Sequence, residues 1–245
     1  MAEYNTMRAQ AGVRSAAIDE GLRAHMNKVY GTMSVGMVLT FLVAWAVGTS
    51  PDLLSVFRDP ATLQPNILGW IVMFAPLIMV FAFSAMINRL SAAAAQLFFY
   101  AFAAVMGLSL AWIFVAFTGF SIAQVFLVTA IAFAGLSLYG YVTKKDLSGM
   151  GTFLIMGVIG LVVASIVNIF LASSALAFAV SVIGVLVFAG LTAYDTQNIK
   201  NTYLQMAHSG DQEWLGKAAI MGALSLYLDF INLFMMLLSL LGNRE

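Results

Sequence analysis

Long apolar stretches alternate with short polar connections along most of this chain. A helix needs about 20 mostly apolar residues to cross a bilayer. Seven stretches meet that length, each with a margin of a few residues at its ends: 29–47, 67–87, 93–117, 122–142, 152–171, 176–198 and 218–241. The connections are short, so the pattern predicts an all-α polytopic membrane protein whose helices form one bundle over residues 29–241. Residues 1–28 are expected to form a polar tail before the bundle, and residues 242–245 a short tail after it.

Composition supports a membrane environment and removes several function classes. Hydrophobic residues make up 62% of the 245 residues and charged residues only 9%, whereas a soluble domain carries about 25% charged residues. The expected partner is therefore the lipid bilayer. Acidic and basic residues balance to a net charge of zero, so no basic field favours nucleic acid. The absence of cysteine excludes thiolate metal sites and cysteine nucleophiles, and we expect no tightly held cofactor.

The distribution of lysine and arginine predicts the orientation of the chain. Cytoplasmic loops carry an excess of these residues. If the N-terminus is cytoplasmic, nine basic residues fall on that side and two on the other. The nine are Arg8, Arg14, Arg23, Lys28, Arg89, Lys144, Lys145, Lys200 and Lys217, and the two are Arg58 and Arg244. Seven full spans would leave the C-terminus outside, whereas a re-entrant last segment would return it to the cytoplasm.

Two acidic residues interrupt the apolar segments, Asp195 in the sixth and Asp229 in the seventh. Charged groups inside a membrane are costly, so they face the bundle interior or a wet cavity and find partners. Each aspartate belongs to a stripe of polar residues at helical spacing. The stripe in the sixth segment also holds Thr192 and Asn198, and that in the seventh holds Ser225 and Asn232. Consecutive helices are expected to be antiparallel neighbours, so the two stripes can face each other.

A facing pair of aspartates has a specific chemical consequence. Two carboxyl groups at short range cannot both ionise cheaply, so one is expected to hold its proton to unusually high pH. Such a pair suits a proton sensor or a transient Ca²⁺ ligand. The alternative is that each aspartate only hydrogen-bonds to neighbouring helices and holds the bundle together. Asp195 also lies near the cytoplasmic end of its segment, where it could reach the interface.

Arg89 and the connection before the last segment complete the candidate chemistry. Arg89 ends the second segment on the same side as Asp195, so it is either a topology charge or a latch that pairs with an aspartate in a closed state. Residues 200–217 are polar and predict a long loop between the sixth and seventh segments.

The two aspartate segments also carry a family resemblance. The run ALSLYLDFINLF at 223–234 resembles the last-helix signature of the Bax inhibitor-1 family. Tyr194-Asp195, the following Gln-Asn-Ile, and the turn KKDLS at 144–148 are similar to other family segments. The resemblance implies six helices around a central seventh and a pH-sensitive calcium leak. It implies Asp195 and Asp229 as the paired sensor and Arg89 as the latch, in a bacterial member of the inner membrane.

Two other functions compete with a channel. Some bacterial members of that family are linked to the membrane protease FtsH, which suggests a non-conducting interaction protein. Two membrane aspartates also suit an intramembrane aspartyl protease. Such proteases read Gly-x-Gly-Asp at the second acid, whereas Asp229 follows Tyr227 and Leu228. We therefore expect no catalytic activity.

Overall fold

Helices make up nearly all of the structure. The computed structural model describes residues 2–60, 62, 64–207 and 211–243, with side chains described from residue 18 onward. Within this part of the chain, seven helices are long and apolar enough to cross a membrane. They are α1 (Ala2–Gly48), α3 (Ile67–Met86), α4 (Ala92–Leu110), α6 (Gly119–Val142), α7 (Ser148–Leu171), α8 (Ser174–Met206) and α9 (Gln212–Leu241). The expected all-α polytopic architecture is confirmed.

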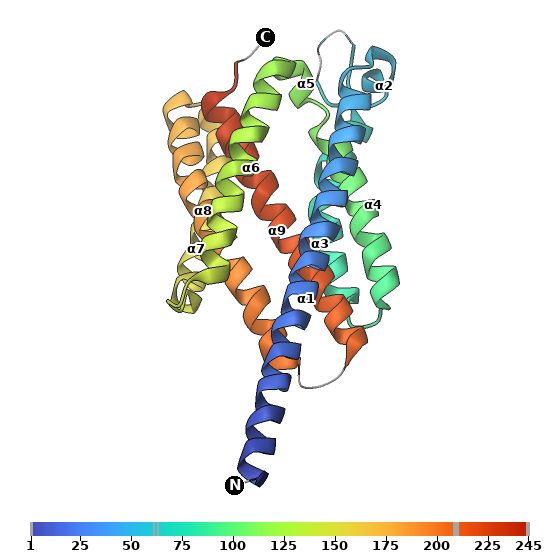
Figure 1. The fold of residues 1–245 in the computed structure, drawn as a ribbon. Coiled ribbons are helices and arrows are strands. Elements are labelled where there is room, and N and C mark those ends of the chain that lie inside the picture. The colour runs from blue at the N-terminus through green and yellow to red at the C-terminus, as the bar shows by residue number, and fades with distance from the viewer. Residues whose placement is uncertain (1, 61, 63, 208–210, 244–245) are drawn as a thin grey trace.

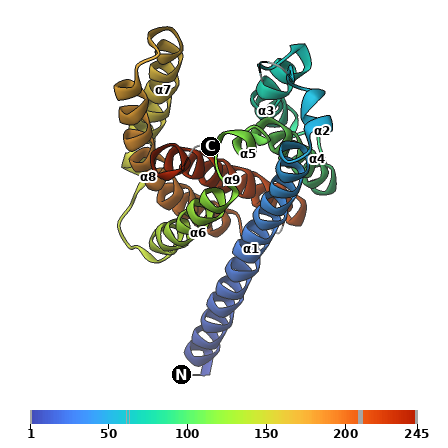
Figure 2. The ribbon, with the colours of Figure 1, turned by 90° about the horizontal axis from the view of Figure 1, so that it is seen from above.

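The last helix lies between two groups of helices (Figures 1 and 2). In both views α6, α7 and α8 stand on one side and α1, α3 and α4 on the other, with α9 crossing between them. Helix α9 packs directly on α1, α4, α6 and α8. Helix α3 packs on α4, and α7 on α8, so these two form the outer flanks. The central position expected for the last helix is confirmed.

Polar side chains fix where the spanning helices begin. A side-chain oxygen at the residue before a helix can accept a hydrogen bond from a free backbone N–H of the first turn. Asn66 does this for α3, Ser91 for α4, Thr118 for α6, Ser173 for α8 and Asp211 for α9. These five polar connections thus supply the cap that starts the next span, whereas α7 begins after Leu147 without a side-chain cap.

The connection before α9 is shorter than the sequence suggested. Helix α8 continues to Met206 and α9 begins at Gln212, so the prediction of a long loop over residues 200–217 is wrong. The helix continues because Ile199 and Tyr203 are buried against the bundle and the Lys200 ammonium donates to the carbonyl of Tyr141 at 2.8 Å. Helix α9 is then unbroken to Leu241, which is the length of a full span and not of a re-entrant segment.

Two other boundaries differ from expectation. Residues 18–28, expected in a polar tail, belong to α1, where Leu22 and Met26 are buried one turn apart. The third expected span, 93–117, is divided: α4 ends at Leu110 and the short helix α5 (Ile113–Ala116) follows. The bend places the Ala111 carbonyl against Gly48 of α1, where a Cβ would overlap that oxygen. A second short helix, α2 (Pro51–Ser55), lies in the connection after α1.

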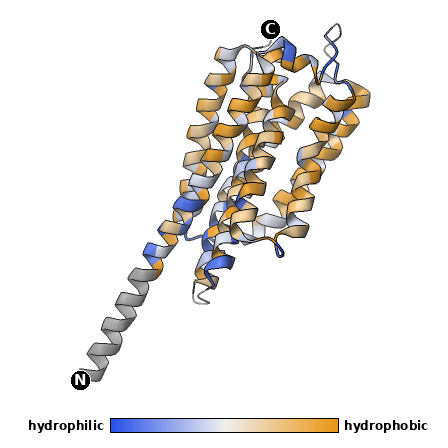
Figure 3. Cartoon of the chain, turned by 90° about the vertical axis from the view of Figure 1, so that its right-hand side faces the viewer, coloured by the Kyte–Doolittle hydropathy of each residue, from blue (hydrophilic) through white to orange (hydrophobic). Residues whose placement is uncertain are grey.

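Hydropathy follows the long axis of the bundle (Figure 3). The middle of the bundle is apolar and polar residues gather toward its ends. One end is called here the basic end. It carries the basic residues that the sequence placed on the same side of the membrane as the N-terminus and whose side chains are described: Arg23, Lys28, Arg89, Lys144, Lys145, Lys200 and Lys217. The side chains of Arg8 and Arg14, and all of Arg244, lie outside the described residues.

Candidate functional site

The two membrane aspartates meet at the interface between α8 and α9. Their carboxyl groups lie close enough to interact with each other, and the buried Oδ2 of Asp229 has no hydrogen-bond partner elsewhere in the described part of the protein. Asp229 is only 5% exposed, and Asp195 is partly buried. Two carboxylates cannot share a contact of this kind inside a bundle unless one of them carries a proton that it donates to the other. The antiparallel packing of neighbouring helices therefore produces the facing pair that the sequence predicted.

The four polar residues that flank the aspartates divide into two kinds. Thr192 is fully buried and its hydroxyl donates to the Phe188 carbonyl of its own helix at 2.8 Å. The Asn232 amide likewise donates within its helix, to the Leu228 carbonyl at 2.8 Å. These two side chains donate hydrogen bonds within their own helices and not to the aspartates.

Asn198 and Ser225 instead line a small polar cavity at the basic end. The cavity has a volume of about 220 Å³ and lies between α1, the end of α3, α8 and α9. Asn198 is one turn from Asp195, and Ser225 one turn from Asp229, so the cavity comes within about one helical turn of the carboxyl pair, which does not itself line it. A polar cavity of this size has room for several water molecules.

A buried histidine faces the same cavity. His25 of α1 is 7% exposed, and its Nε2 has no hydrogen-bond partner in the described part of the protein. Its ring packs on that of Tyr203, with the centroids 4.9 Å apart. Lys217 also lines the cavity. The cavity thus combines amide, hydroxyl, imidazole and ammonium groups beside the aspartates.

Arg89 is not part of this cluster. It lies beyond the end of α3 and its side chain is exposed. Asp195 and Asp229 interact with each other and not with Arg89 in the described state. Its neighbour Asn88 does line the cavity. The family resemblance implies that Arg89 is a latch that pairs with an aspartate. That role requires a different state, in which Arg89 turns inward, and it remains a prediction.

A chain of hydroxyl groups beside the aspartates was not anticipated. The Tyr30 hydroxyl of α1 hydrogen-bonds to Ser137 of α6, and Ser137 to Thr196 of α8 at 2.9 Å. Thr196 in turn donates to the Thr192 carbonyl at 2.8 Å. Thr196 is the residue after Asp195, so this chain ties α1 and α6 to the segment that carries one carboxyl. Isolated hydroxyls in apolar segments gave no sequence signal for it.

A second missed residue fixes the turn between α6 and α7. Gln197 is buried, and its amide donates to the Lys145 carbonyl and accepts from the Leu147 N–H, both at 2.8 Å. In the same turn the Ser148 hydroxyl and N–H donate to Asp146, which lowers the pKa of that exposed carboxyl below its usual value. These contacts connect the KKDLS turn to the aspartate helix.

Two residues before Asp229 on α9, a buried tyrosine contacts two other helices. Tyr227 is fully buried and its hydroxyl is 2.6 Å from that of Thr40 in α1. The Thr40 hydroxyl also lies 2.8 Å from the Ala103 carbonyl, to which it donates. The rings of Phe99 and Phe102 meet Tyr227 edge to face. The interior around Tyr227 is therefore a packed aromatic layer that joins α1, α4 and α9.

The aspartate pair alone offers few oxygen ligands for a metal ion. Ca²⁺ takes six to eight oxygen ligands when it is tightly held. Across the described residues, no group of three or more His, Cys, Asp or Glu side chains is arranged to hold a metal ion. Asp195 and Asp229 therefore bring together only two carboxyl groups.

Comparisons with known proteins cover almost the entire chain. A family model described as "Inhibitor of apoptosis-promoting Bax1" matches residues 22–245. The "Inner membrane protein YbhL" of Escherichia coli K12 is 49% identical over 92% of this chain and 94% of its own length. A protein of Caulobacter vibrioides is 48% identical over 94% of this chain and 92% of its own. A Streptococcus pyogenes protein named as an uncharacterized membrane protein is 35% identical over 93% of this chain and 96% of its own.

Proposed function

Because the chain belongs to the Bax inhibitor-1 family, we propose that it is a pH-sensitive calcium leak channel controlled by the Asp195–Asp229 pair. The observation that carries this proposal is the contact between the two carboxyl groups at the α8–α9 interface. By analogy with YbhL, named an inner membrane protein, it acts in a bacterial inner membrane. The charge distribution favours a cytoplasmic basic end and N-terminus.

The shared proton gives the pair two states. With the proton present, one carboxyl donates to the other and the α8–α9 contact is held closed. Without it, two negative charges oppose each other at short range in a medium of low dielectric, and the contact becomes unfavourable. The separated carboxylates then offer hard oxygen ligands to a passing Ca²⁺ ion. Flux is therefore expected to rise with pH. An incomplete ligand set favours passage over tight binding.

The polar cavity extends from the basic end to within about one helical turn of the pair. Its Asn198 and Ser225 lie one turn from the two aspartates, and water in the cavity would carry protons and ions to them. The ionisable groups near this route are His25 and Lys217, which line the cavity. Lys200 is directed away to the Tyr141 carbonyl, and Arg89 is exposed.

The test is Ca²⁺ flux into liposomes that contain only the purified protein. We expect wild-type flux to rise several-fold between about pH 6 and pH 8. Asp195→Asn and Asp229→Asn should each flatten that curve, because an amide does not titrate. Asp146→Asn is the matched control: its carboxyl is exposed in a turn, and the lowered pKa keeps it ionised throughout this range, so the variant should follow the wild type.

Two results would contradict the proposal in different ways. If both pair variants keep the full pH response, the sensor lies elsewhere. If the purified protein conducts nothing at any pH, the non-conducting alternative is favoured, in which the chain acts by binding a partner such as the FtsH protease. Cleavage of a membrane peptide that stops in Asp229→Asn would overturn our proposal that the protein is not an enzyme.

A further inference from the structure

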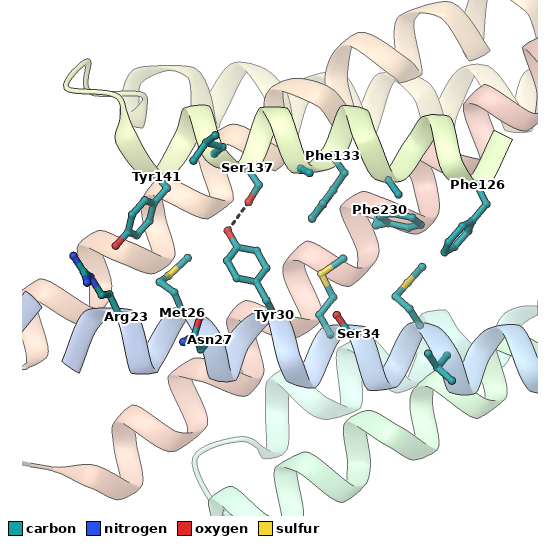
Figure 4. Close-up of a pocket in the computed structure, with 16 residues that line it drawn as sticks. Arg23, Met26, Asn27, Tyr30, Ser34, Phe126, Phe133, Ser137, Tyr141 and Phe230 are labelled. Atoms are coloured by element: carbon teal, nitrogen blue, oxygen red, sulfur yellow. Dashed lines mark hydrogen bonds between the residues drawn. The ribbon is translucent and has the colours of Figure 1, made fainter. Parts of the chain in front are cut away.

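A groove separates α1 from α6 on the side of the bundle (Figure 4). Helix α1 packs on α4 and α9, and α6 on α8 and α9, but the two helices have little direct contact with each other. The space between them has a volume of about 730 Å³. Phe230 of α9 forms its floor, and the Tyr30–Ser137 hydrogen bond crosses it. A second cavity of about 600 Å³ continues it along the same helices and shares Met37, Val38 and Phe126 with it.

The chemistry of the groove changes along its length. At the basic end its lining is polar, with Arg23, Asn27 and Tyr141. Lys200 lies beside Tyr141, with its ammonium 5.2 Å from the ring centroid. Deeper in the membrane the lining is almost wholly apolar, and most of it is methionine, phenylalanine and alanine. The groove thus has a cationic, hydrogen-bonding head and an apolar tail.

The length of this groove matches one leaflet. From Arg23 to Val38 the helix rises about 22 Å, at 1.5 Å per residue. Half of a bilayer with its headgroups is about 20–22 Å thick. An empty apolar space at membrane depth would lose van der Waals contacts on both walls, and the molecules available there are lipids.

We propose that the α1–α6 groove binds one anionic phospholipid, with its phosphate at Arg23 and one acyl chain between the two helices. An arginine guanidinium is well suited to a phosphate because it presents several N–H donors in a planar fork. Lys200 adds a second positive charge at the same depth. Methionine and phenylalanine side chains conform to a flexible chain. The lipid then acts as part of the α1–α6 contact.

Native mass spectrometry of the detergent-solubilised protein tests this proposal, with phosphatidylglycerol and phosphatidylethanolamine of identical chains as probes. We expect wild type to retain phosphatidylglycerol in clear preference to the zwitterionic lipid. Arg23→Gln should lower that retention several-fold by removing the phosphate contact. Ala134→Phe and Ser34→Leu lie on opposite walls of the groove, and each should lower retention by filling the apolar part of the groove. Two such variants are used in case one of them fails to fold.

Two control variants distinguish binding in the groove from non-specific attraction of an anionic lipid to the basic end. Lys144→Gln removes another exposed cation at the basic end, and Val163→Phe adds an aromatic ring to an exposed position of α7. Both should retain phosphatidylglycerol as wild type does. The proposal would be overturned if the control variants lost phosphatidylglycerol as the groove variants do, or if wild type retained both lipids equally. It would also be overturned if the protein were a dimer that Ala134→Phe dissociates. Because the readout involves no ion flux, its outcome is independent of the channel proposal.

Discussion

Helix α8 and the α1–α6 groove show two opposite ways for helices to meet in this bundle. Around α8, helices approach closely: the Gly140 backbone of α6 lies against the Ala193 carbonyl, and the aspartates join α8 to α9. Between α1 and α6 the helices stay apart, leaving a groove that is bridged by the Tyr30–Ser137 hydroxyls. Lipid tails are as apolar as leucine, so small residues and polar contacts, rather than hydrophobicity, bring membrane helices together. The comparison identifies α8 as the closely packed part of the bundle and the α1–α6 side as the loosely packed part.

The largest effect is expected where α6 meets α8. Gly140→Ala would place a Cβ on the Ala193 backbone, which cannot move aside as a flexible side chain would. We expect overpacking to lower the free energy of unfolding by about 1–3 kcal/mol. Gly135→Ala is the control on the same helix, since a Cβ there meets nothing within 4 Å. Thermal unfolding in detergent measures both, and equal midpoints for the two variants would argue against a close α6–α8 contact.

A smaller effect on stability is expected in the α1–α6 groove. Tyr30→Phe removes the hydroxyl that bridges the groove, while Ser137 keeps its bond to Thr196. The loss should be about 0.5–1.5 kcal/mol, with a wider separation of α1 and α6. Tyr139→Phe, at an exposed position of α6, is the control.

Spin labels report that separation directly, because the chain has no cysteine of its own. A label pair at Val35→Cys of α1 and Leu138→Cys of α6 occupies two exposed positions. We expect a broader and longer distance distribution in Tyr30→Phe than in Tyr139→Phe. Indistinguishable distributions would mean that the hydroxyl bridge does not hold the groove.

The sequence predicted the aspartate pair because a charge in an apolar segment is costly and must find a partner. It also located the spans, since their lengths and polar connections are explicit. It did not predict that α8 continues past Asn198, because Tyr203 and Ile199 are held by tertiary packing. The groove and the Tyr30–Ser137–Thr196 chain were equally hidden. Both depend on distances between helices, which periodicity along one helix does not contain.

The smallest effect is expected at Arg89, which lies outside both regions. Its guanidinium is exposed and pairs with neither aspartate in the described state, so Arg89→Ala should leave the α8 contacts intact. If a closed state with Arg89 turned inward is populated, its loss should raise basal leak. Because Arg89 is exposed in the described structure, the inward state is the minor one, and the rise should be small.

Arg89→Lys separates the latch from the topology charge. Lysine keeps the positive charge that orients the helix but lacks the planar fork that binds a carboxylate through two N–H groups. A latch predicts that leak rises in both variants, whereas a topology charge predicts that only alanine has an effect. Reporter fusions after Lys145 and after Gly119 measure the topology directly, and in wild type they should lie on opposite sides of the membrane. Unchanged leak and unchanged reporters in Arg89→Ala would leave Arg89 with neither role.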